Sequence, residues 1–505
     1  MSIGWIMLIV ATIGWHVGLY GMFKKAGMDA WKALIPFYNT WCMVEKMELK
    51  KVWFFLQFIP VAGQFITIWI TIKFVEHFGR FGFLHHAATV FVPFIYFPYL
   101  GFSKNEKYAG KLAVNNYVKS ATREWIDAAA FAIVAATLIR TFVFEAYTIP
   151  TPSMEKTLLV NDFLFVSKFS YGPRIPNTPI AMPFIHNTMP FSNGKSYSEM
   201  IELPYTRWLP SPVKRNDVVV FNFPVNDTLI NDAENQFGSK ITYYEVVQQL
   251  GREETWNRYG ADIITRPVDK RENFIKRCVA VGGDVLQIVN GKVIVNGQPQ
   301  PVFPQSERYY TLKMPANAYP DKETLEAIGI KIHEGDDIGD VRPTSIPNEY
   351  LVNITNEEFA HLKIPTGYSI NDSIQGEDNR TFPYFNSNPN IHWGMDNYGP
   401  ITVPQKGSTI QLTTDNLVRY QRCIQVYENN KVENRDGQIF INDNSATTYT
   451  FKMNYYWMMG DNRHNSQDSR YWGFVPEDHV VGKASLIWFS WEKGPRWKRI
   501  FKSIK

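Results

Sequence analysis

Cysteine is scarce in this sequence. Its 505 residues include only three cysteines, Cys42, Cys278 and Cys423, and no Cys-x-x-Cys pair. Such a small and odd number of thiols excludes a disulfide framework and a cysteine-based zinc site. Because free cysteine is among the most buried residue types, we expect Cys278 and Cys423 to be small apolar residues of a core.

The sequence also lacks a strong charge of either sign. It has 52 basic and 48 acidic residues, a net charge of +4, and no basic stripe interleaved with aromatic residues. This composition excludes nucleic acid as an expected partner. No repeat of about 20 to 50 residues is present, which argues against a propeller or a solenoid. We expect no cofactor and no metal ion.

Long apolar runs are missing after residue 145 and frequent before it. The four runs, each about long enough to span a bilayer, cover roughly 3–21, 52–72, 83–102 and 125–144. The third contains Pro93 and Pro98, so a kinked or re-entrant segment is an alternative to a straight span. The first is a poor signal peptide, since no Lys or Arg precedes it and no Ala-x-Ala site follows.

The charges between these runs predict an orientation. Lysines are frequent between the first and second runs and between the third and fourth, whereas the connection between the second and third holds only Lys73 and Arg80. The positive-inside rule then places the two lysine-rich loops in the cytoplasm. Everything after residue 145 is therefore expected on the outer side of a membrane, and the lipid bilayer is an expected partner.

After residue 145 the pattern is that of β structure. Short β-branched or aromatic runs alternate with turn residues at 218–224, 284–298 and 437–443, and two Asn-Gly pairs inside 284–298 predict hairpins. Short helices are expected near 322–329 and 356–362. The predicted domains are a membrane domain at 1–124, a transmembrane anchor at 125–145, a catalytic β core at 146–284 and 451–505, and a β-rich insertion at 285–450.

One serine is distinguished by its setting. Ser153 follows the fourth apolar run by about ten residues, and Pro150 and Pro152 stiffen the backbone before it. A serine hydroxyl is a weak nucleophile unless a base takes its proton. No histidine after residue 145 lies in a Gly-x-Ser-x-Gly or similar hydrolase context, so a different base is needed.

Lys276 is the best candidate for that base. In a strand over ENFIKRCVAVGGD (272–284), alternation places Phe274, Lys276 and Cys278 on one face and Arg277 on the other. Desolvation by apolar neighbours lowers the pKa of a lysine, ordinarily about 10.4, by up to several units. A lysine that is neutral near physiological pH can act as a general base. The alternative is that Lys276 and Arg277 are solvated surface charges.

A third segment, YWMMGDNRHNSQDSRYWGFVPEDHVVGKA (456–484), concentrates Gly, Asp, Asn, Arg and Ser in its first half. Such a segment is either a polar turn whose side chains cap their own backbone or a set of hydrogen-bonding groups that holds a catalytic amine in place. The sequence pattern alone leaves both open.

These segments together resemble the type I signal peptidases. IPTPSM (149–154) resembles the nucleophile box of that family, and KRNDVVVFNFP (214–224) resembles a structural strand written Arg-Gly-Asp-x-Val-Val-Phe. NFIKRCVAVGGD resembles the lysine box, and MGDNRHNSQDSRYWGFVP is close to identical with the Gly-Asp-Asn box. The multi-span N-terminus, with AWKALIPFYN at 30–39, resembles a form associated with Bacteroidetes-type bacteria.

The resemblance implies a role for each matching residue. Ser153 would be the nucleophile and Lys276 the general base. Thr151 would help to form the oxyanion hole, and Ser466 would orient the Lys276 amine. Structural support would come from Asp461, Asp468 and Arg470, and substrate pockets from Ile149, Pro150, Met154, Leu158, Phe274 and Ile275. Two positions depart from the family: Lys156 stands in place of a usual proline, which predicts a less rigid turn, and Asn216 in place of a glycine.

The implied fold is a multi-span α-helical membrane N-terminus followed by a mainly-β catalytic domain with a large insertion. The implied function is removal of signal peptides from exported preproteins after an Ala-x-Ala-like motif. The implied location is the bacterial inner membrane with the catalytic domain on the periplasmic side, and the secretion translocon is a possible partner. Two rivals are a self-cleaving repressor with a serine–lysine pair and an inactive, membrane-tethered adaptor.

Overall fold

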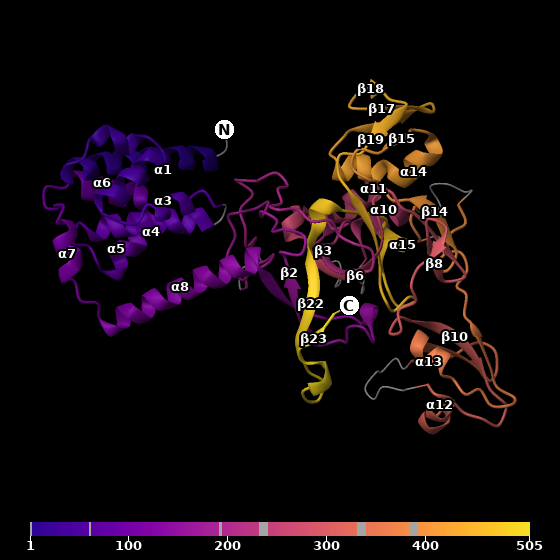
Figure 1. Ribbon diagram of the computed structural model, residues 1–505. Helices are drawn as coiled ribbons and strands as arrows, with labels where there is room; N and C mark the ends of the chain where they lie inside the picture. The colour runs from indigo at the N-terminus through magenta and orange to yellow at the C-terminus, as the bar shows by residue number, and fades with distance from the viewer. Residues whose placement is uncertain are drawn as a thin grey trace. The chain divides into compact units, whose positions relative to one another are not determined.

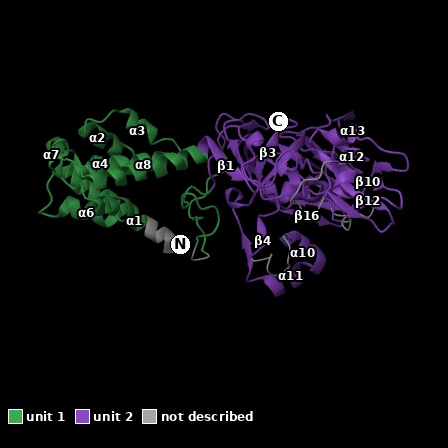
Figure 2. Ribbon diagram, turned by 90° about the horizontal axis from the view of Figure 1, so that it is seen from below, with its two compact units in different colours: residues 1–141, 178–206 green, residues 142–177, 207–505 purple. Residues whose placement is uncertain are grey.

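The computed structural model describes residues 3–59, 62–190, 194–231, 241–330, 340–378, 380–383 and 391–504, and of residues 3–8 the backbone only. The chain divides into two compact units (Figure 2). The first contains residues 1–141 and 178–206, and the second contains residues 142–177 and 207–505. Each unit is described by itself.

The first unit is helical. Its helices are α1 (Ile3–Lys25), the short helix η1 (Ala30–Leu34), α2 (Tyr38–Lys46), α3 (Val52–Leu56), α4 (Ala62–Glu76), α5 (Phe83–Phe91), α6 (Pro93–Phe102), α7 (Gly110–Asn116) and α8 (Ala121–Phe142). The alanine-rich sequence of α8 favours an uninterrupted helix. The second apolar run, by contrast, is divided between α3 and α4.

Within the described part of the chain, α8 is the one helix long and apolar enough to cross a membrane. Helices α5 and α6 together pass the same test, but they meet at a bend of 118°. The bend follows from Pro93, which begins α6 and leaves the carbonyl groups of α5 without a donor at that position. The prediction of a kinked or re-entrant third run is therefore confirmed.

Glycines bring α1 and α6 into close contact. A Cβ atom added to Gly18 would lie 2.4 Å from the backbone nitrogen of Pro98, and one added to Gly21 would lie 2.8 Å from Gly101. Side chains at these two positions of α1 would push the helices apart. Small residues that let two helix backbones approach in this way are common between membrane helices.

The second unit contains an antiparallel sheet (Figure 1). Its strands run in the order β1 (Phe144–Thr148), β2 (Asp162–Ser167), β22 (Val480–Ser490), β3 (Val218–Asn222), β6 (Asn273–Val281), β20 (Tyr455–Met459) and β21 (Val475–Pro476), with β23 (Lys502–Ser503) paired to β22. The prediction of a mainly-β domain is confirmed. Strands far apart in the sequence are neighbours here, since β22 lies between β2 and β3 and β20 lies beside β6.

Residues 285–450 add further sheets. One has the order β14 (Tyr398–Thr402), β7 (Val285–Val289), β8 (Lys292–Val295) and β9 (Gln298–Pro299), and another the order β11 (Val341–Pro343), β12 (Glu349–Thr355), β10 (Glu307–Lys313) and β13 (Ser369–Asp372). The hairpins predicted at the two Asn-Gly pairs are confirmed. Asn290, Gly291, Asn296 and Gly297 all have positive φ, as the tight turns between twisted strands require.

The remaining strands are short and pair as β4 (Thr228–Ile230) with β5 (Ile263–Thr265), β15 (Thr409–Gln411) with β19 (Thr448–Thr450), and β17 (Gln438–Ile441) with β16 (Val432–Arg435) and β18 (Asn444–Ser445). The helices are α10 (Tyr243–Leu250), α11 (Arg252–Tyr259), α12 (Lys322–Ile328), α13 (Asn356–Ala360), α14 (Thr414–Arg422) and α15 (Ser469–Trp472). The short helices predicted near 322–329 and 356–362 are confirmed.

One core joins the main sheet to the inserted strands. Ala280 and Trp457 of the main sheet pack in the same buried cluster as Leu286 and Ile401 of the inserted sheet. Cys278 and Cys423 are buried and free, as their predicted role as small apolar residues requires. The insertion is therefore continuous with the interior of the second unit.

Candidate active site

The turn that carries Ser153 follows the first strand of the main sheet. Residues Pro152–Met154 form one turn of 3-10 helix, and Thr151 before them is extended. Ser153 is 8% exposed, whereas Thr151 beside it is exposed to solvent. The Thr151 Oγ1 atom lies 3.5 Å from Ser153 Oγ. The serine hydroxyl is thus sheltered, with a second hydroxyl at its open side.

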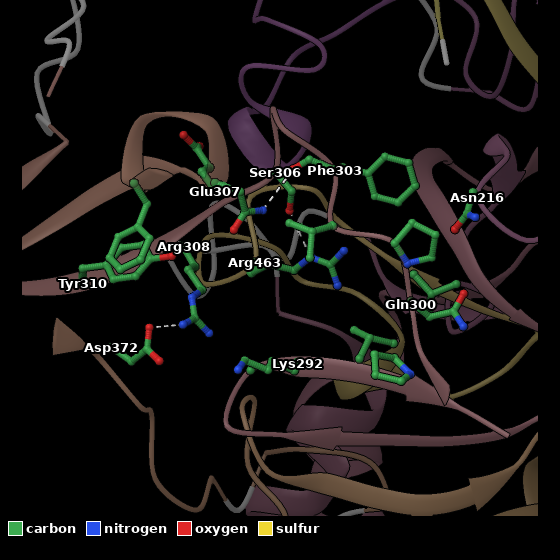
Figure 3. Close-up of a pocket in the computed structure, with 18 of the residues that line it drawn as sticks. Asn216, Lys292, Gln300, Phe303, Ser306, Glu307, Arg308, Tyr310, Asp372 and Arg463 are labelled. Atoms are coloured by element: carbon green, nitrogen blue, oxygen red, sulfur yellow. Dashed lines mark hydrogen bonds and ion pairs between the residues drawn. The ribbon is translucent and has the colours of Figure 1, made fainter. Parts of the chain in front are cut away.

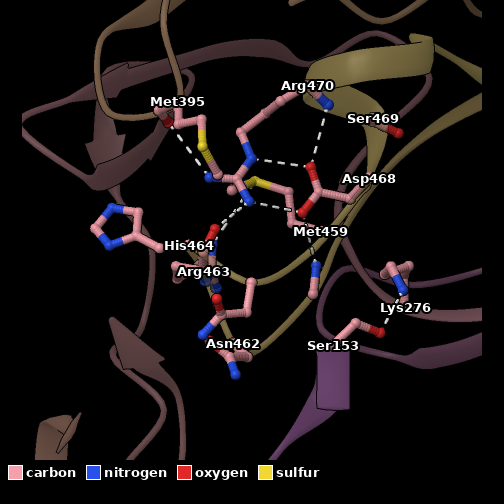
Figure 4. A network of polar contacts seen from close by, with 12 residues as sticks. Ser153, Lys276, Met395, Met459, Asn462, Arg463, His464, Asp468, Ser469 and Arg470 are labelled. Atoms are coloured by element: carbon pink, nitrogen blue, oxygen red, sulfur yellow. Dashed lines mark hydrogen bonds and ion pairs between the residues drawn. The ribbon is translucent and has the colours of Figure 1, made fainter. Parts of the chain in front are cut away.

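Lys276 reaches Ser153 from the middle of β6. Its Nζ atom is in hydrogen-bond contact with Ser153 Oγ at 2.7 Å and donates to the carbonyl oxygen of Ile275 at 3.1 Å (Figure 4). The side chain is 3% exposed, and its Nζ lies 5.6 Å from the centre of the Phe274 ring. The sequence segments that carry the two residues are 123 positions apart and meet at this point.

Burial decides the charge of this lysine. Loss of hydration lowers the pKa of Lys276 to about 8, while Asp468 and Asp461 act in the opposite direction. The predicted alternation along β6 is confirmed, because Phe274 packs in the same cluster as Cys278 and Ile275 in a different one. The alternative of two solvated charges is wrong, since Arg277 is only 1% exposed.

Asp468 and Arg470 hold the polar turn that follows β20. The two side chains form a fully buried ion pair at 2.8 Å, and Asp468 Oδ2 also accepts the backbone N–H of Gly460 at 3.1 Å. Arg470 donates in addition to the carbonyl oxygens of Arg463 and Met395 (Figure 4). The pair therefore closes the turn on itself and ties it to the inserted segment.

Asp461 forms a second buried ion pair, with Arg277. The guanidinium group donates Nε to Oδ1 at 2.8 Å and Nη2 to Oδ2 at 2.6 Å, and Thr157 donates its hydroxyl to Oδ2 at 2.7 Å. Burial opposes ionisation of this carboxyl group, but Arg277 holds its pKa below the usual value. One aspartate therefore links the lysine strand, the polar turn and the nucleophile turn.

Ser466 lies against Gly460 beside the nucleophile. A Cβ atom added to Gly460 would come within 2.2 Å of Ser466 Oγ and 2.4 Å of the Ser153 carbonyl oxygen. Only a glycine leaves room for both. The Ser466 hydroxyl is buried and makes no hydrogen bond within the described residues, including none to Lys276.

The residues expected to line substrate pockets separate into buried and accessible ones. Ile149, Met154 and Leu158 pack in one buried cluster with the partly buried Ile275. Pro150 is exposed, and Phe274 is partly buried against a different cluster. Pro150 and Phe274 therefore offer the more accessible apolar surface of this set.

Several contacts of this site were not foreseen from the sequence. The backbone N–H of Asn462 donates to the Ser153 carbonyl oxygen at 3.2 Å. His464, the histidine nearest in sequence to the polar turn's centre, has both ring nitrogens engaged, one by the N–H of Tyr309 and the other by Asp396. Because the partners of His464 are Tyr309 and Asp396, which lie far away in the sequence, no local sequence pattern indicates these contacts.

Within the described ranges, no three His, Cys, Asp or Glu side chains gather as a metal ion requires. A mainly-β unit in which a sheltered serine hydroxyl contacts a buried lysine has the features of a serine hydrolase. This is the class of protein that the fold and the site indicate together.

Comparison with known families identifies the group within that class. The model of a family described as "Signal peptidase, peptidase S26" matches residues 122–336 and 403–491, more than half of the chain. The chain belongs to this family. It is a serine endopeptidase that removes signal peptides from preproteins. Residues 31–111 match a second family, which is described only as of unknown function (DUF5684).

Individual relatives agree with the family match. The chain is 26% identical over 385 residues to signal peptidase I of Haemophilus influenzae. This match covers 73% of this chain and 72% of that protein. It is 25% identical over 388 residues to signal peptidase I of Helicobacter pylori, covering 74% and 89%. A shorter match to signal peptidase I of Rickettsia akari is 36% identical over 114 residues, covering 22% and 35%.

Proposed function

We propose that Ser153 and Lys276 form the catalytic dyad of this signal peptidase. The observation that carries the proposal is the 2.7 Å contact between Lys276 Nζ and Ser153 Oγ, both in side chains that are at most 8% exposed. A lysine with a pKa near 8 is neutral in an appreciable fraction of molecules at neutral pH. The neutral amine can then take the proton of the hydroxyl group.

The chemistry follows from this contact. Ser153 Oγ attacks the carbonyl carbon of the scissile bond as its proton passes to Lys276 Nζ. The lysine returns that proton to the nitrogen of the departing mature chain, which leaves an acyl-enzyme on Ser153. A water molecule then attacks the acyl group as its proton passes to Lys276, which gives the proton to Ser153 Oγ as the ester bond breaks, and the signal peptide is released with a carboxylate end.

Thr151 and Ser466 are proposed to assist the dyad. The exposed Thr151 hydroxyl is within 3.5 Å of Ser153 Oγ, where it can donate to the oxyanion together with the Ser153 backbone N–H. The Ser466 hydroxyl and the Ser153 carbonyl oxygen both lie against Gly460, and this hydroxyl has no hydrogen-bond partner among the described residues, so it is available to orient the Lys276 amine. Asp461, Asp468 and Arg470 act structurally through the two buried ion pairs.

The substrate is proposed to present small residues one and three positions before the cut. Ile149, Met154 and Leu158 are fully packed, and Ile275 is partly buried beside them. Pockets between such groups are shallow, because a larger substrate side chain must displace packed neighbours at about 1–3 kcal/mol. An extended substrate also directs alternate side chains to one face. An Ala-x-Ala motif satisfies both conditions.

A multi-span membrane domain at 1–124 and a transmembrane anchor at 125–145 are proposed to hold the enzyme in the bacterial inner membrane. The apolar side chains of α8, such as Trp125 and Phe131, are 78% and 74% exposed, and no residue of this helix is buried. Lipid is the environment that such a helix fits. The catalytic core at 146–284 and 451–505, with the insertion at 285–450, would then face the periplasm. The lipid bilayer, and the secretion translocon beside it, are the proposed partners.

The test is cleavage of a preprotein by the full-length enzyme in detergent, with the cut located by mass spectrometry. We expect one cut after an Ala-x-Ala motif, and much slower cleavage when Leu or Lys replaces either alanine. The Ser153→Ala variant serves as the inactive control. Equal rates across the substrate panel would refute the pocket proposal, and cleavage by the Ser153→Ala variant would refute the proposed nucleophile.

A further inference from the structure

The turn after Ser153 contains a buried lysine that the reaction does not use. Lys156 is 7% exposed, and its Nζ atom lies 3.3 Å from Asp340 Oδ2 and 4.0 Å from Glu307 Oε2. Both residues belong to the insertion: Asp340 lies 184 positions and Glu307 151 positions further along the chain. A buried ammonium group is unfavourable unless opposite charges face it. The contact therefore fixes the nucleophile turn to the insertion.

The backbone of Lys156 points to the same conclusion. Its φ is 65°, in the left-handed region that favours glycine, and proline cannot adopt this angle. The proline that the family usually has at the position of Lys156 would therefore not fit this turn. The turn is closed instead by a hydrogen bond from the Leu158 N–H to the Met154 carbonyl oxygen at 2.7 Å. A conformation of this kind persists when its surroundings determine it, and the side chain of Lys156 is held here by Asp340 and lies beside Glu307.

The same part of the insertion also contacts the polar turn. Ser306 Oγ and the Glu307 N–H both donate to the Asp461 carbonyl oxygen, at 2.8 and 2.9 Å, and the Arg463 N–H donates to the Glu307 carbonyl oxygen at 2.8 Å. Figure 3 shows Ser306, Glu307 and Arg463 together at the edge of a cavity of about 520 Å³. Although they border this cavity, Ser306 and Glu307 are buried, and the three hydrogen bonds attach them to the polar turn.

These contacts form a closed circuit around the nucleophile. Asn462, next to Asp461, donates its N–H to the Ser153 carbonyl oxygen at 3.2 Å. From Ser153 the chain runs three residues to Lys156, whose side chain returns to Asp340 and Glu307. The insertion is therefore joined to the nucleophile turn on both sides, once through the polar turn and once through Lys156.

We propose that Lys156 is a positioning residue: its buried ammonium group, paired with Asp340 and lying beside Glu307, sets the place of Ser153 relative to Lys276. The insertion then contributes to the geometry of the active site through Asp340 and Glu307. The proposal rests on the proposed role of Ser153 as the nucleophile. Lys156 does not touch the reacting atoms, and it acts through the turn that carries them.

The charges of the cluster agree with this role. Burial disfavours the ammonium form of Lys156, but Asp340, Glu307 and Glu155 together raise its pKa. Burial raises the pKa of Glu307 to about 8, with Lys156 acting in the opposite direction and Asp340, Glu155 and Glu358 in the same direction. Near neutral pH the attraction is therefore mainly between Lys156 and Asp340, with a protonated Glu307 beside them.

The test compares kcat and KM of the full-length wild-type enzyme with those of Lys156→Met, Lys156→Arg, Asp340→Asn and the Lys156→Met/Asp340→Asn double variant. Methionine keeps the length and apolar stem of the lysine without its charge. We expect Lys156→Met and Asp340→Asn each to lower kcat by about 10- to 100-fold, because small misplacements of a nucleophile are that damaging. KM should change by less than about twofold, since the substrate surface is intact.

Because the two residues act through one contact, the double variant should be no slower than the slower single variant. Lys156→Arg, which keeps the charge, should recover most of kcat. The matched control is Lys168→Met, because Lys168 also forms a partly buried ion pair, with Glu145 at 2.9 Å, and follows the end of β2 that is remote from Ser153. Its kcat should equal that of the wild type.

A wild-type kcat in both Lys156→Met and Asp340→Asn would overturn the proposal. So would an equal loss in Lys168→Met, which would show a general loss of stability, or a rise in KM at constant kcat. Should Lys156→Met not fold, as judged by its thermal unfolding, Asp340→Asn decides the matter. Cleavage by Ser153→Ala in the same assay would refute the dyad instead, so the two failures are distinguishable.

Discussion

At the scale of single residues, the burial of Lys276 makes both activity and stability depend on pH. The amine must be neutral to act as a base, and its pKa is lowered to about 8. We expect kcat/KM to rise as pH increases through about 8, measured with an Ala-x-Ala peptide in buffers of constant ionic strength. A rising limb near the ordinary lysine pKa of about 10.4 would show a solvated amine and contradict the account.

The same shift has a definite sign in stability. A lysine whose pKa falls on folding binds fewer protons in the native state, so its burial destabilises the fold below pH 8, and the deficit disappears as pH rises from about 8 to about 10.5. Lys276→Met should therefore be inactive and yet more stable than the wild type at pH 7, by about 1–3 kcal/mol. Urea unfolding at pH 7 and pH 10 measures this, and a gain that does not shrink at the higher pH would contradict it.

How far the residues of the site could be predicted depends on whether their signal is local. The alternation along β6 is a local property, and it was enough to predict that Lys276 shares a face with Phe274 and Cys278. The burial of Arg277 depends on Asp461, 184 positions away, so the strand pattern alone could not distinguish a buried pair from a solvated charge. The contact of Lys156 with Asp340 is beyond prediction for the same reason.

At the scale of elements, the Asp461–Arg277 pair joins β6 to the turn after β20. Both side chains are at most 1% exposed, and two hydrogen bonds connect them. Asp461→Asn leaves a buried guanidinium group without its carboxylate, so we expect it to lower the free energy of unfolding by about 3–5 kcal/mol. The control is Glu254→Gln, which breaks the exposed Glu254–Arg258 pair and should leave the free energy of unfolding nearly unchanged.

Urea unfolding of the two variants beside the wild type measures both values. Equal losses for Asp461→Asn and Glu254→Gln would mean that the buried pair does not join these elements. Loss of activity in Asp461→Asn at full stability would also be unexpected, because this aspartate is assigned a structural role.

Elements with strong turn signals were predicted, but some elements whose signals are visible in the sequence were missed. The Asn-Gly pairs at 290–291 and 296–297 fix the hairpins of β7, β8 and β9, since few other residues adopt positive φ so readily. Helix α10 was missed although Thr242 and Glu245 form a capping box at its start, a signal that is visible in the sequence. The division of the second apolar run between α3 and α4 also had a visible signal, since the sequence of the run contains Pro60, a helix-breaking residue.

At the scale of the whole molecule, the distribution of lysines between the apolar runs predicts the side of the membrane on which catalysis occurs. A reporter that is active only outside the cytoplasm should be active when fused to the C-terminal end of the chain. The matched control is a fusion after Asn116, in the lysine-rich loop before the fourth run, which should be inactive. Activity in the opposite pattern would overturn the proposed topology, while leaving the dyad unaffected.

The central claim is that Ser153 and Lys276 act as one catalytic unit. Its most direct test is kcat/KM for signal-peptide cleavage by Ser153→Ala, Lys276→Ala and the double variant, each shown to be folded by its thermal unfolding. The account predicts that each single variant is essentially inactive at every pH and that the double variant is no slower than either, since removing one partner already removes the function of the pair. Appreciable turnover by Lys276→Ala at neutral pH, or a double variant far slower than both single variants, would contradict it.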